Sequence, residues 1–151
     1  MQEPLNLPVS TALLIPHTPP MRLVKRLVEF DGSEGWVESC RLAENPLFSD
    51  SGVLPLYTMA ELIAQAYAAV KGYQDLSAGR PIQKGYLVGI RKIEVLEFVP
   101  GTRPLLIRIR SAGEFGGFYM ADGEVTLDSK CIAQGTVKLW VPGEADEKRR
   151  T

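Results

Sequence analysis

The sequence has few of the residues that bind metal ions. It contains one histidine, His17, and two cysteines, Cys40 and Cys131, which lie far apart in the chain. Protein zinc sites are built from clustered histidine and cysteine ligands at short spacings. We therefore expect no metal and no cofactor, and we interpret the cysteines as buried thiols in a reducing cytoplasm.

The sequence also lacks an excess of one charge and a long apolar segment. Its formal net charge is −1, which gives no electrostatic reason to expect binding to nucleic acid or to an anionic membrane. No apolar run approaches the ~20 residues that span a bilayer. The N-terminus has no basic region of the kind that begins a signal peptide. We expect a cytoplasmic protein without nucleic-acid or membrane partners.

The bulk composition is that of an ordinary globular domain. Hydrophobic residues make up 45% of the chain and charged residues 23%. A length of 151 residues suits one domain with a sizeable core. We expect a single domain over residues 1–143, followed by a charged, disordered tail over residues 144–151.

One stretch, Pro55–Gly72, is apolar almost all the way round. Its apolar residues recur at the spacing of a helix, which predicts a helix enclosed by other elements. The proline at its start suits a first helical position, and the glycine at its end suits a helix stop. Thr58, Glu61 and Gln65 form one narrow polar stripe. Because a carboxylate on an enclosed helix is costly unless it is paired, Glu61 is a candidate functional residue.

Six further segments have the alternation or the β-branched residues typical of strands. They cover residues 21–30, 35–42, 85–98, 103–111, 118–127 and 131–141. The last two are expected to pair as a hairpin, residues 113–117 to form a glycine-rich turn, and residues 1–11 to form an irregular arm. Strands and helices do not alternate, so a parallel α/β fold is not expected. The order predicts an α+β fold in which an antiparallel sheet of about six strands curls around one long central helix. Such an open sheet has unpaired edges, which favours dimerisation by edge pairing.

Four segments resemble, in order, the motifs of one enzyme family. They are the Pro-His-x-x-Pro segment at 15–24, the Glu-Asn-x-x-Phe loop at 44–48, the Glu-x-x-Ala-Gln helix at 61–66, and the Gly-Ile-x-Lys strand at 89–92 with the turn at 99–101. Together they span roughly residues 14–140. With them the chain resembles the hotdog-fold β-hydroxyacyl-[acyl-carrier-protein] dehydratases of fatty-acid synthesis.

The resemblance assigns catalysis to His17 and Glu61. It implies that the two meet across a dimer interface, with His17 of one subunit facing Glu61 of the other. Dehydration of a 3-hydroxyacyl thioester removes a proton next to the carbonyl group and protonates the departing hydroxyl group. Histidine is suited to be the base near neutral pH, and Glu61 would hold or relay the second proton.

The resemblance also implies residues that bind the substrate. Gln65 is expected to position groups by hydrogen bonding. Backbone N–H groups near the start of the helix would polarise the thioester carbonyl group. The candidates for these donors are Val53, Leu54 and Leu56. The acyl chain is expected beside the central helix, near Tyr86, Leu87 and Gly89.

The sequence departs from the family pattern just before the helix. The Gly-His-Phe-Pro-Gly-like stretch of the family is missing, and residues 49–52 stand in its place. Pro55, which has no N–H group, occupies the position of a family glycine. These features are closer to a divergent branch of predicted dehydratases associated with aryl-polyene or similar lipid pathways. Some members of that branch act in mixed dehydratase dimers.

Two other functions fit the same residues. In a hotdog thioesterase, Glu61 would activate water or attack the thioester, and His17 would be dispensable. Alternatively, the chain is a non-catalytic acyl-binding subunit of a hetero-oligomeric dehydratase. In each case the substrate is a thioester of acyl carrier protein or of coenzyme A. Basic residues that would attract an acidic carrier, or simply form a solvated strand face, are Arg22, Lys25, Arg26, Arg91 and Lys92.

Overall fold

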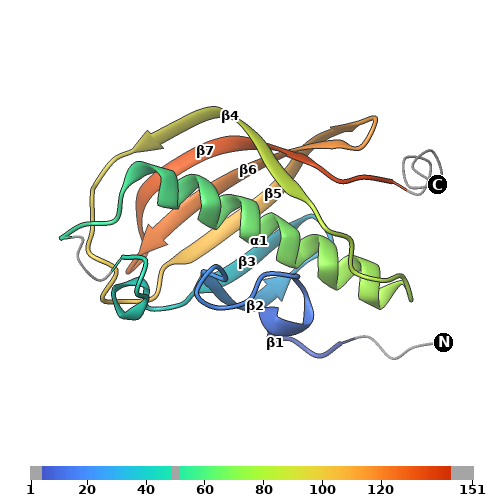
Figure 1. Cartoon of the computed structure of the whole chain (residues 1–151), viewed down its shortest axis with the longest axis horizontal. Coiled ribbons are helices and arrows are strands. Elements are labelled where there is room, and N and C mark those ends of the chain that lie inside the picture. The colour runs from blue at the N-terminus through green and yellow to red at the C-terminus, as the bar shows by residue number, and fades with distance from the viewer. Residues whose placement is uncertain (1–4, 49–51, 144–151) are drawn as a thin grey trace.

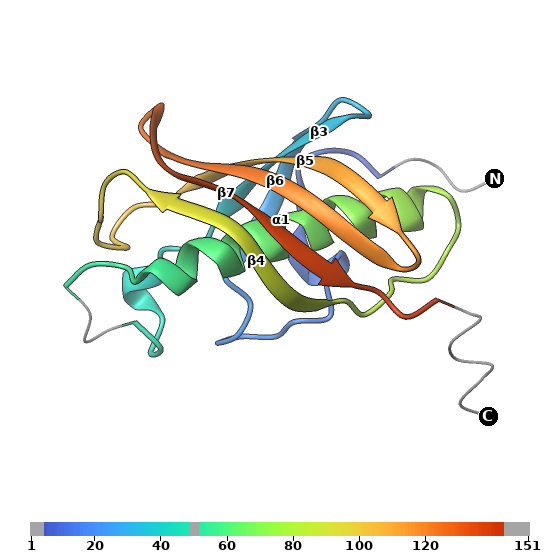
Figure 2. The same ribbon diagram turned by 90° about the horizontal axis from the view of Figure 1, so that it is seen from above.

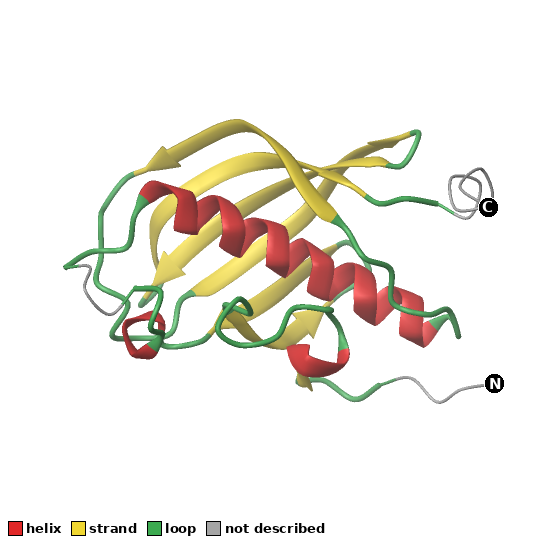
Figure 3. Cartoon of the chain, in the orientation of Figure 1, coloured by secondary structure: helices red, strands yellow, loops and turns green. Residues whose placement is uncertain are grey.

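The computed structural model describes residues 5–48 and 52–143. Within these residues, one antiparallel sheet of seven strands curves around one long helix, as Figures 1 and 3 show. The strand order is β1-β2-β3-β5-β6-β7-β4. The helix is α1 (Leu56–Ser77), and the strands are β1 (Val9–Ser10), β2 (Val24–Phe30), β3 (Glu34–Ser39), β4 (Tyr86–Val95), β5 (Leu106–Phe115), β6 (Phe118–Leu127) and β7 (Lys130–Trp140). Two short 3-10 helices are η1 (Thr11–Leu13) and η2 (Leu42–Glu44).

The concave face of the sheet packs on α1, and this contact forms the core. Strands β2 to β7 all contact the helix, which lies in the hollow of the curved sheet when the molecule is seen from above (Figure 2). The apolar positions of α1 are buried on several sides, as the sequence pattern predicts. The hotdog architecture is therefore confirmed.

The predicted end of the helix at Gly72 is wrong. The helix continues to Ser77, and Pro55 is its N-cap residue. Gly72 is instead required by packing, because a Cβ atom at this position would lie 2.0 Å from the backbone oxygen of Leu14. The glycine marks a close approach between two segments, and the sequence alone did not distinguish this role from a helix stop.

The sheet contains one strand more than the sequence predicts. Residues 1–11 were expected to form an irregular arm, but Val9 and Ser10 pair with Leu27 and Arg26 of β2. The hydroxyl group of Thr11 fixes this corner by donating to the backbone oxygen of Val24 at 2.6 Å. A two-residue strand followed at once by a 3-10 turn leaves too short a pattern to recognise.

The other strands follow the predicted order with shifted ends. Residues 113–117 were expected to form one glycine-rich turn, but β5 continues to Phe115, with a register shift between Ser111 and Gly113. The turn itself is Gly116-Gly117, and both residues have positive φ angles of 57° and 87°. A two-residue hairpin turn requires such angles. The hairpin predicted between β6 and β7 is confirmed.

The predicted charged tail, residues 144–151, lies outside the described residues. Within them, no helix is long and apolar enough to cross a membrane.

Candidate active site

His17 lies in the proline-rich loop between η1 and β2. The loop is closed by hydrogen bonds from the backbone N–H groups of Met21 and Arg22 to the backbone oxygen of Thr18, at 2.8 and 3.1 Å. The Nδ1 atom of His17 is buried, and it has no hydrogen-bond partner among the described residues. A buried polar atom without a partner is uncommon in a folded protein, and a catalytic role is one recognised reason for it.

Asn45 holds the histidine loop from the other side. Its Nδ2 atom donates to the backbone oxygen of Pro20 at 2.8 Å, and its Oδ1 atom accepts from the backbone N–H of Leu47 at 2.8 Å. The segment that carries the Glu-Asn-x-x-Phe motif therefore has a structural reason for its asparagine. The side chain ties the loop after η2 to the loop that carries His17.

Gln65 joins the same loop to the helix. Its Oε1 atom accepts a hydrogen bond from the backbone N–H of Leu23 at 2.7 Å. Its Nε2 atom donates to the backbone oxygen of Met21 at 2.8 Å and to Oε1 of Glu61 at 2.9 Å. These three bonds, which we call the glutamine clamp, use both N–H groups of the amide. Gln65 is therefore placed to position Glu61 rather than to bind a substrate through its own polar atoms.

His17 and Glu61 of the same chain both line one cavity of about 190 Å³. It lies between α1 and the start of β4, and three other residues predicted to bind the substrate, Gln65, Tyr86 and Leu87, also line it. The remaining lining residues are Leu14, Pro16, Ala64, Tyr67, Ala68, Lys71, Gly72, Gln83, Gly85, Leu139 and Val141.

Four predicted residues do not line this cavity: Val53, Leu54, Leu56 and Gly89. Leu54 is also unsuited to donate to a thioester, since its backbone N–H already donates to the backbone oxygen of Val99 at 2.8 Å and its side chain is buried. Val53 and Leu56 are half exposed near the start of the helix. Gly89 is paired with Lys138 of β7.

Three residues that line the cavity on the C-terminal side of Glu61 were not predicted from the sequence as site residues: Ala64, Ala68 and Lys71. Their helical spacing from Glu61 was visible, because residues three and four apart share a helix face. What the spacing did not reveal was which face would line a cavity. Gln83, in the loop before β4, and Leu139, on β7, also line the cavity. Only the tertiary structure places them there.

Tyr67 is a buried, neutral part of the wall. Burial raises the pKa of its phenol above the usual range, and a hydrogen bond with the Ser111 side chain partly opposes that shift. The two cysteines are free and half-buried, and burial is the main cause that raises the pKa of each thiol. Neither cysteine lines the cavity.

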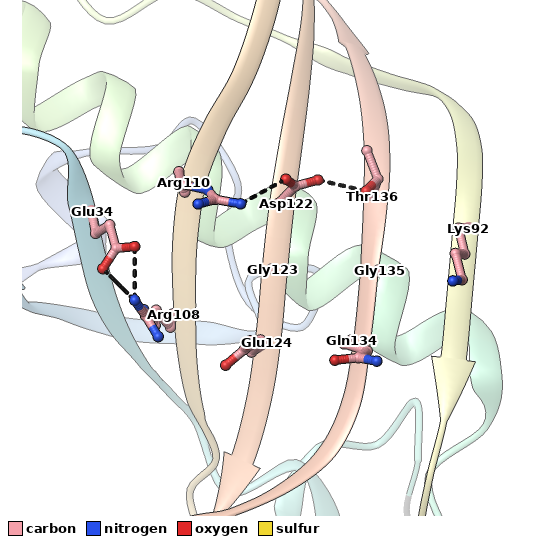
Figure 4. A pocket seen from close by; sticks show the side chains of 10 residues that line it. All are labelled: Glu34, Lys92, Arg108, Arg110, Asp122, Gly123, Glu124, Gln134, Gly135 and Thr136. Carbon is pink, nitrogen blue, oxygen red and sulfur yellow. Dashed lines mark hydrogen bonds and ion pairs between the residues drawn. The ribbon is translucent and has the colours of Figure 1, made fainter.

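A second hollow, of about 490 Å³, lies on the strands of the sheet (Figure 4). Several of its polar groups pair with one another: Arg108 bonds both carboxylate oxygens of Glu34, and Asp122 contacts both Arg110 and Thr136. In the cavity with His17, by contrast, the buried Nδ1 atom has no hydrogen-bond partner among the described residues. Among the described residues, no group of three or more His, Cys, Asp or Glu side chains could hold a metal ion.

Comparison with known proteins identifies the family. Residues 9–149 match the sequence model of the ApeP-like family, which is described as ApeP dehydratase. The chain belongs to the ApeP-like dehydratases. This family match covers the histidine loop, the central helix and all the strands of the sheet.

Named relatives agree with this assignment. The ApeP-like chain is 30% identical over 145 residues to the 3-hydroxyacyl-[acyl-carrier-protein] dehydratase FabZ of Magnetococcus marinus, covering 87% of this chain and 92% of the relative. Its fold matches the dehydratase heterocomplex ApeI:P from Xenorhabdus doucetiae with a TM-score of 0.81 and 17% identity, over 94% of this chain and 97% of that chain.

A more distant fold match is a mutant thioesterase from Pseudomonas aeruginosa. It has a TM-score of 0.51 and 14% identity, and the match covers 78% of this chain and 80% of that chain. The likeness shows a shared fold alone. The family assignment of the ApeP-like chain therefore supports dehydration over thioester hydrolysis.

Proposed function

We propose that this ApeP-like protein is a 3-hydroxyacyl thioester dehydratase in which His17 is the general base and Glu61 the general acid. One observation supports the proposal above all. The two side chains line one cavity of a single chain, and His17 Nδ1 is buried there without a hydrogen-bond partner in the described part of the chain. A base and an acid must both come within hydrogen-bond reach of one substrate.

The reaction converts a 3-hydroxyacyl thioester into a 2-enoyl thioester and water. His17 takes a proton from the carbon next to the carbonyl group. The carbon–oxygen bond at the following carbon then breaks, and Glu61 gives its proton to the departing hydroxyl group. His17 ends protonated and Glu61 ionised, so transfer of one proton from His17 to Glu61 restores the starting state. The bond from Gln65 to Glu61 keeps the acid aimed during these steps.

The acyl chain is proposed to lie between α1 and β4. Ala64 and Ala68 leave space on the helix, while Leu87 and Leu139 provide apolar walls. Burial of an alkyl chain against such walls is favourable by about 0.8 kcal/mol for each CH₂ group. This placement agrees with the substrate positions predicted at Tyr86 and Leu87.

The test is an assay of purified protein with 3-hydroxyacyl and enoyl thioesters that follows dehydration, hydration and free thiol. We expect His17→Ala and Glu61→Gln each to lower the dehydration rate by about 10²–10⁴-fold. Glu29→Gln is the matched control, because Glu29 is exposed on β2 and lines neither the cavity nor the second hollow on the strands of the sheet. If His17→Ala still releases free thiol, the dehydratase assignment is wrong and the thioesterase alternative takes its place.

Mixing the two inactive variants distinguishes a site within one chain from a site shared between subunits. If His17 and Glu61 of the same chain act together, every site in a mixed dimer still carries one defect and the mixture stays inactive. If the pair is shared across an interface, as the family resemblance implies, one of the two sites in a mixed dimer is intact. Recovered activity would therefore show that the site is shared between two subunits at their interface.

The carrier is proposed to be acyl carrier protein. The name of the Magnetococcus marinus relative supports this choice, since it specifies that carrier. Among the candidate basic residues, Arg26 is paired with Glu38 at 3.2 Å, whereas no ion pair within the described residues involves Arg22, Lys25, Arg91 or Lys92. A comparison of kcat/KM for one acyl group on acyl carrier protein and on coenzyme A tests the choice.

A second candidate function is that of one subunit in a mixed hotdog dehydratase. It is favoured by the fold match to the ApeI:P heterocomplex and by Pro55 at the N-cap of α1, where no N–H group is available. In that case the purified chain is inactive alone and turns over substrate only when a second hotdog protein is added. Glu61→Gln would then abolish the activity of the mixture.

A further inference from the structure

The cavity that holds His17 and Glu61 extends along one face of α1. Glu61, Ala64, Ala68 and Lys71 follow one another at helical spacing, and all four line it. Lys71 follows Glu61 by ten positions along the helix, which corresponds to about 15 Å along the axis. The middle of this path is apolar, so it forms a groove that begins at a carboxylate and ends at an ammonium group.

A different hollow, of about 630 Å³, lies beyond this groove at the C-terminal end of the helix. Three residues, Tyr67, Lys71 and Gln83, line both spaces. They therefore form the partition between the groove and the distal hollow. Unlike the groove, the distal hollow is lined by several charged side chains, among them Asp75 and Arg80.

Contacts on the far side hold the Lys71 side chain in this partition. Its Nζ atom lies 3.5 Å from Oδ2 of Asp75 and 5.2 Å from the centre of the Tyr119 ring. The Asp75 side chain is only 4% exposed, and that of Lys71 is 19% exposed. Arg80 binds the other carboxylate oxygen, Oδ1, at 3.1 Å. Oδ2 has no hydrogen-bond partner among the described residues, so the ion pair with Lys71 is its compensation.

We propose that Lys71 closes the distal end of the acyl groove and sets the length of the acyl chain that this protein accepts. The inference rests on the proposed function in one respect, that the cavity is the acyl-binding groove. An acyl tail that stops before Lys71 passes Ala64 and Ala68 on the helix and the apolar side chains of β4 and β7. A longer tail would either lie against the ammonium group or displace it from Asp75, and both leave a buried charge poorly compensated.

The effect of removing Lys71 follows from the partition. With a small apolar residue at this position the groove opens into the distal hollow, and Oδ1 of Asp75 keeps Arg80 as a partner while Oδ2 loses its ion pair. The variant therefore accommodates tails that the wild-type protein excludes. Short tails do not reach residue 71, so their binding is unchanged.

The test measures binding of saturated acyl-pantetheine thioesters by titration calorimetry, with butanoyl, octanoyl, dodecanoyl and hexadecanoyl chains. For the wild-type protein we expect the affinity to rise with length and then to fall once the tail reaches Lys71. In Lys71→Ala the ratio of hexadecanoyl to octanoyl affinity should increase at least ~10-fold, with butanoyl affinity unchanged. Lys71→Met keeps the stem of the side chain without its charge, and it provides a second variant if Lys71→Ala folds poorly.

Lys138→Ala is the matched control. Lys138 also places Nζ over an aromatic ring, 4.4 Å from the centre of Phe118, but it lines neither the groove nor the distal hollow. The proposal is overturned if both Lys71 variants keep the wild-type length profile, or if the wild-type protein binds none of the thioesters. A shifted length profile in a protein that shows no dehydration with any partner would instead contradict the proposed reaction and leave the role of Lys71 standing.

Discussion

Gln65 connects two segments that carry the proposed acid and base. Its amide contacts Glu61 within the helix and the backbone of Met21 and Leu23 in the segment that follows His17. The side chain is 1% exposed, so its bonds do not compete with water. The amide group of Gln65 therefore ties the histidine loop to the helix.

We predict that Gln65→Met lowers both stability and activity. Methionine fills a similar volume, but it leaves the buried N–H of Leu23 and a backbone oxygen without partners, which costs about 1–3 kcal/mol for each unsatisfied group. Loss of the bond to Glu61 should lower kcat by about 100-fold, because a displaced catalytic group loses much of its effect. Urea denaturation and dehydration kinetics measure the two effects.

Gln134→Met serves as the control for this prediction. Gln134 lies on β7 and is exposed, and its side chain makes only a long contact of 3.5 Å with Glu94. We expect the free energy of unfolding and kcat of this variant to stay close to the wild-type values. Equal behaviour of the two variants would show that the glutamine clamp does not position Glu61.

At the scale of elements, the long helix depends on a close approach to the N-terminal segment. Leu14 is fully buried, and its backbone oxygen points at Gly72. Near this contact, Asp75 pairs with Lys71 one turn earlier in α1 and with Arg80 just after the helix ends. The helix therefore continues through a glycine that would end many exposed helices.

We predict that Gly72→Ala destabilises the fold, although alanine favours helices by about 1 kcal/mol over glycine. The new Cβ atom would lie 2.0 Å from the Leu14 oxygen, so one of the two segments must move. Such overpacking costs about 1–3 kcal/mol. Thermal and urea denaturation measure the change. Gly52→Ala is the control because a Cβ atom there meets nothing within 4 Å, and a stable Gly72→Ala protein would contradict the predicted clash.

The sequence predicted the elements whose signal is local. The apolar periodicity of α1 and the hairpin between β6 and β7 depend on neighbouring residues, and the structure confirms both. The length of α1 and the short strand β1 were missed for the opposite reason. Gly72 packs against the backbone of Leu14, and Val9 pairs with Leu27 in the sheet. Both partners are distant in sequence.

The candidate site shows the same division. His17 and Glu61 are chemically conspicuous in the sequence, and the structure places both on one cavity. Nothing in the sequence distinguishes Lys71 from any other lysine near the end of a helix. Its contacts with Asp75 and Tyr119 become visible only in the structure. The proposed donor at Leu54 fails because Val99 already accepts its N–H, a long-range bond that no local pattern reveals.

For the whole molecule, strand β4 stands out as an unpaired edge. It is the last strand in the sheet order and runs for ten residues beside β7 alone. Three of its large apolar side chains, Leu87, Val88 and Ile90, are 37%, 51% and 52% exposed. An exposed apolar edge strand favours pairing with another sheet. We therefore expect two hotdog chains to associate along β4.

We predict that Val88→Lys converts the assembled protein into monomers. Lysine on an edge strand opposes pairing between edges, and two copies related by a two-fold axis bring both new charges into the same interface. Sedimentation velocity measures the mass. Phe115→Lys is the control, since Phe115 is 85% exposed at a hairpin tip away from β4. An unchanged mass in Val88→Lys would exclude β4 as the interface.

The hydrogen bond from Leu23 to Gln65 has a consequence for measurement. The Leu23 amide hydrogen lies just before β2 and is held by a side chain rather than by a neighbouring strand. To exchange with deuterium from the solvent, it must wait until the amide of Gln65 releases it. The deuterium uptake at this single residue therefore reports how often the helix and the histidine loop separate, without any substrate present.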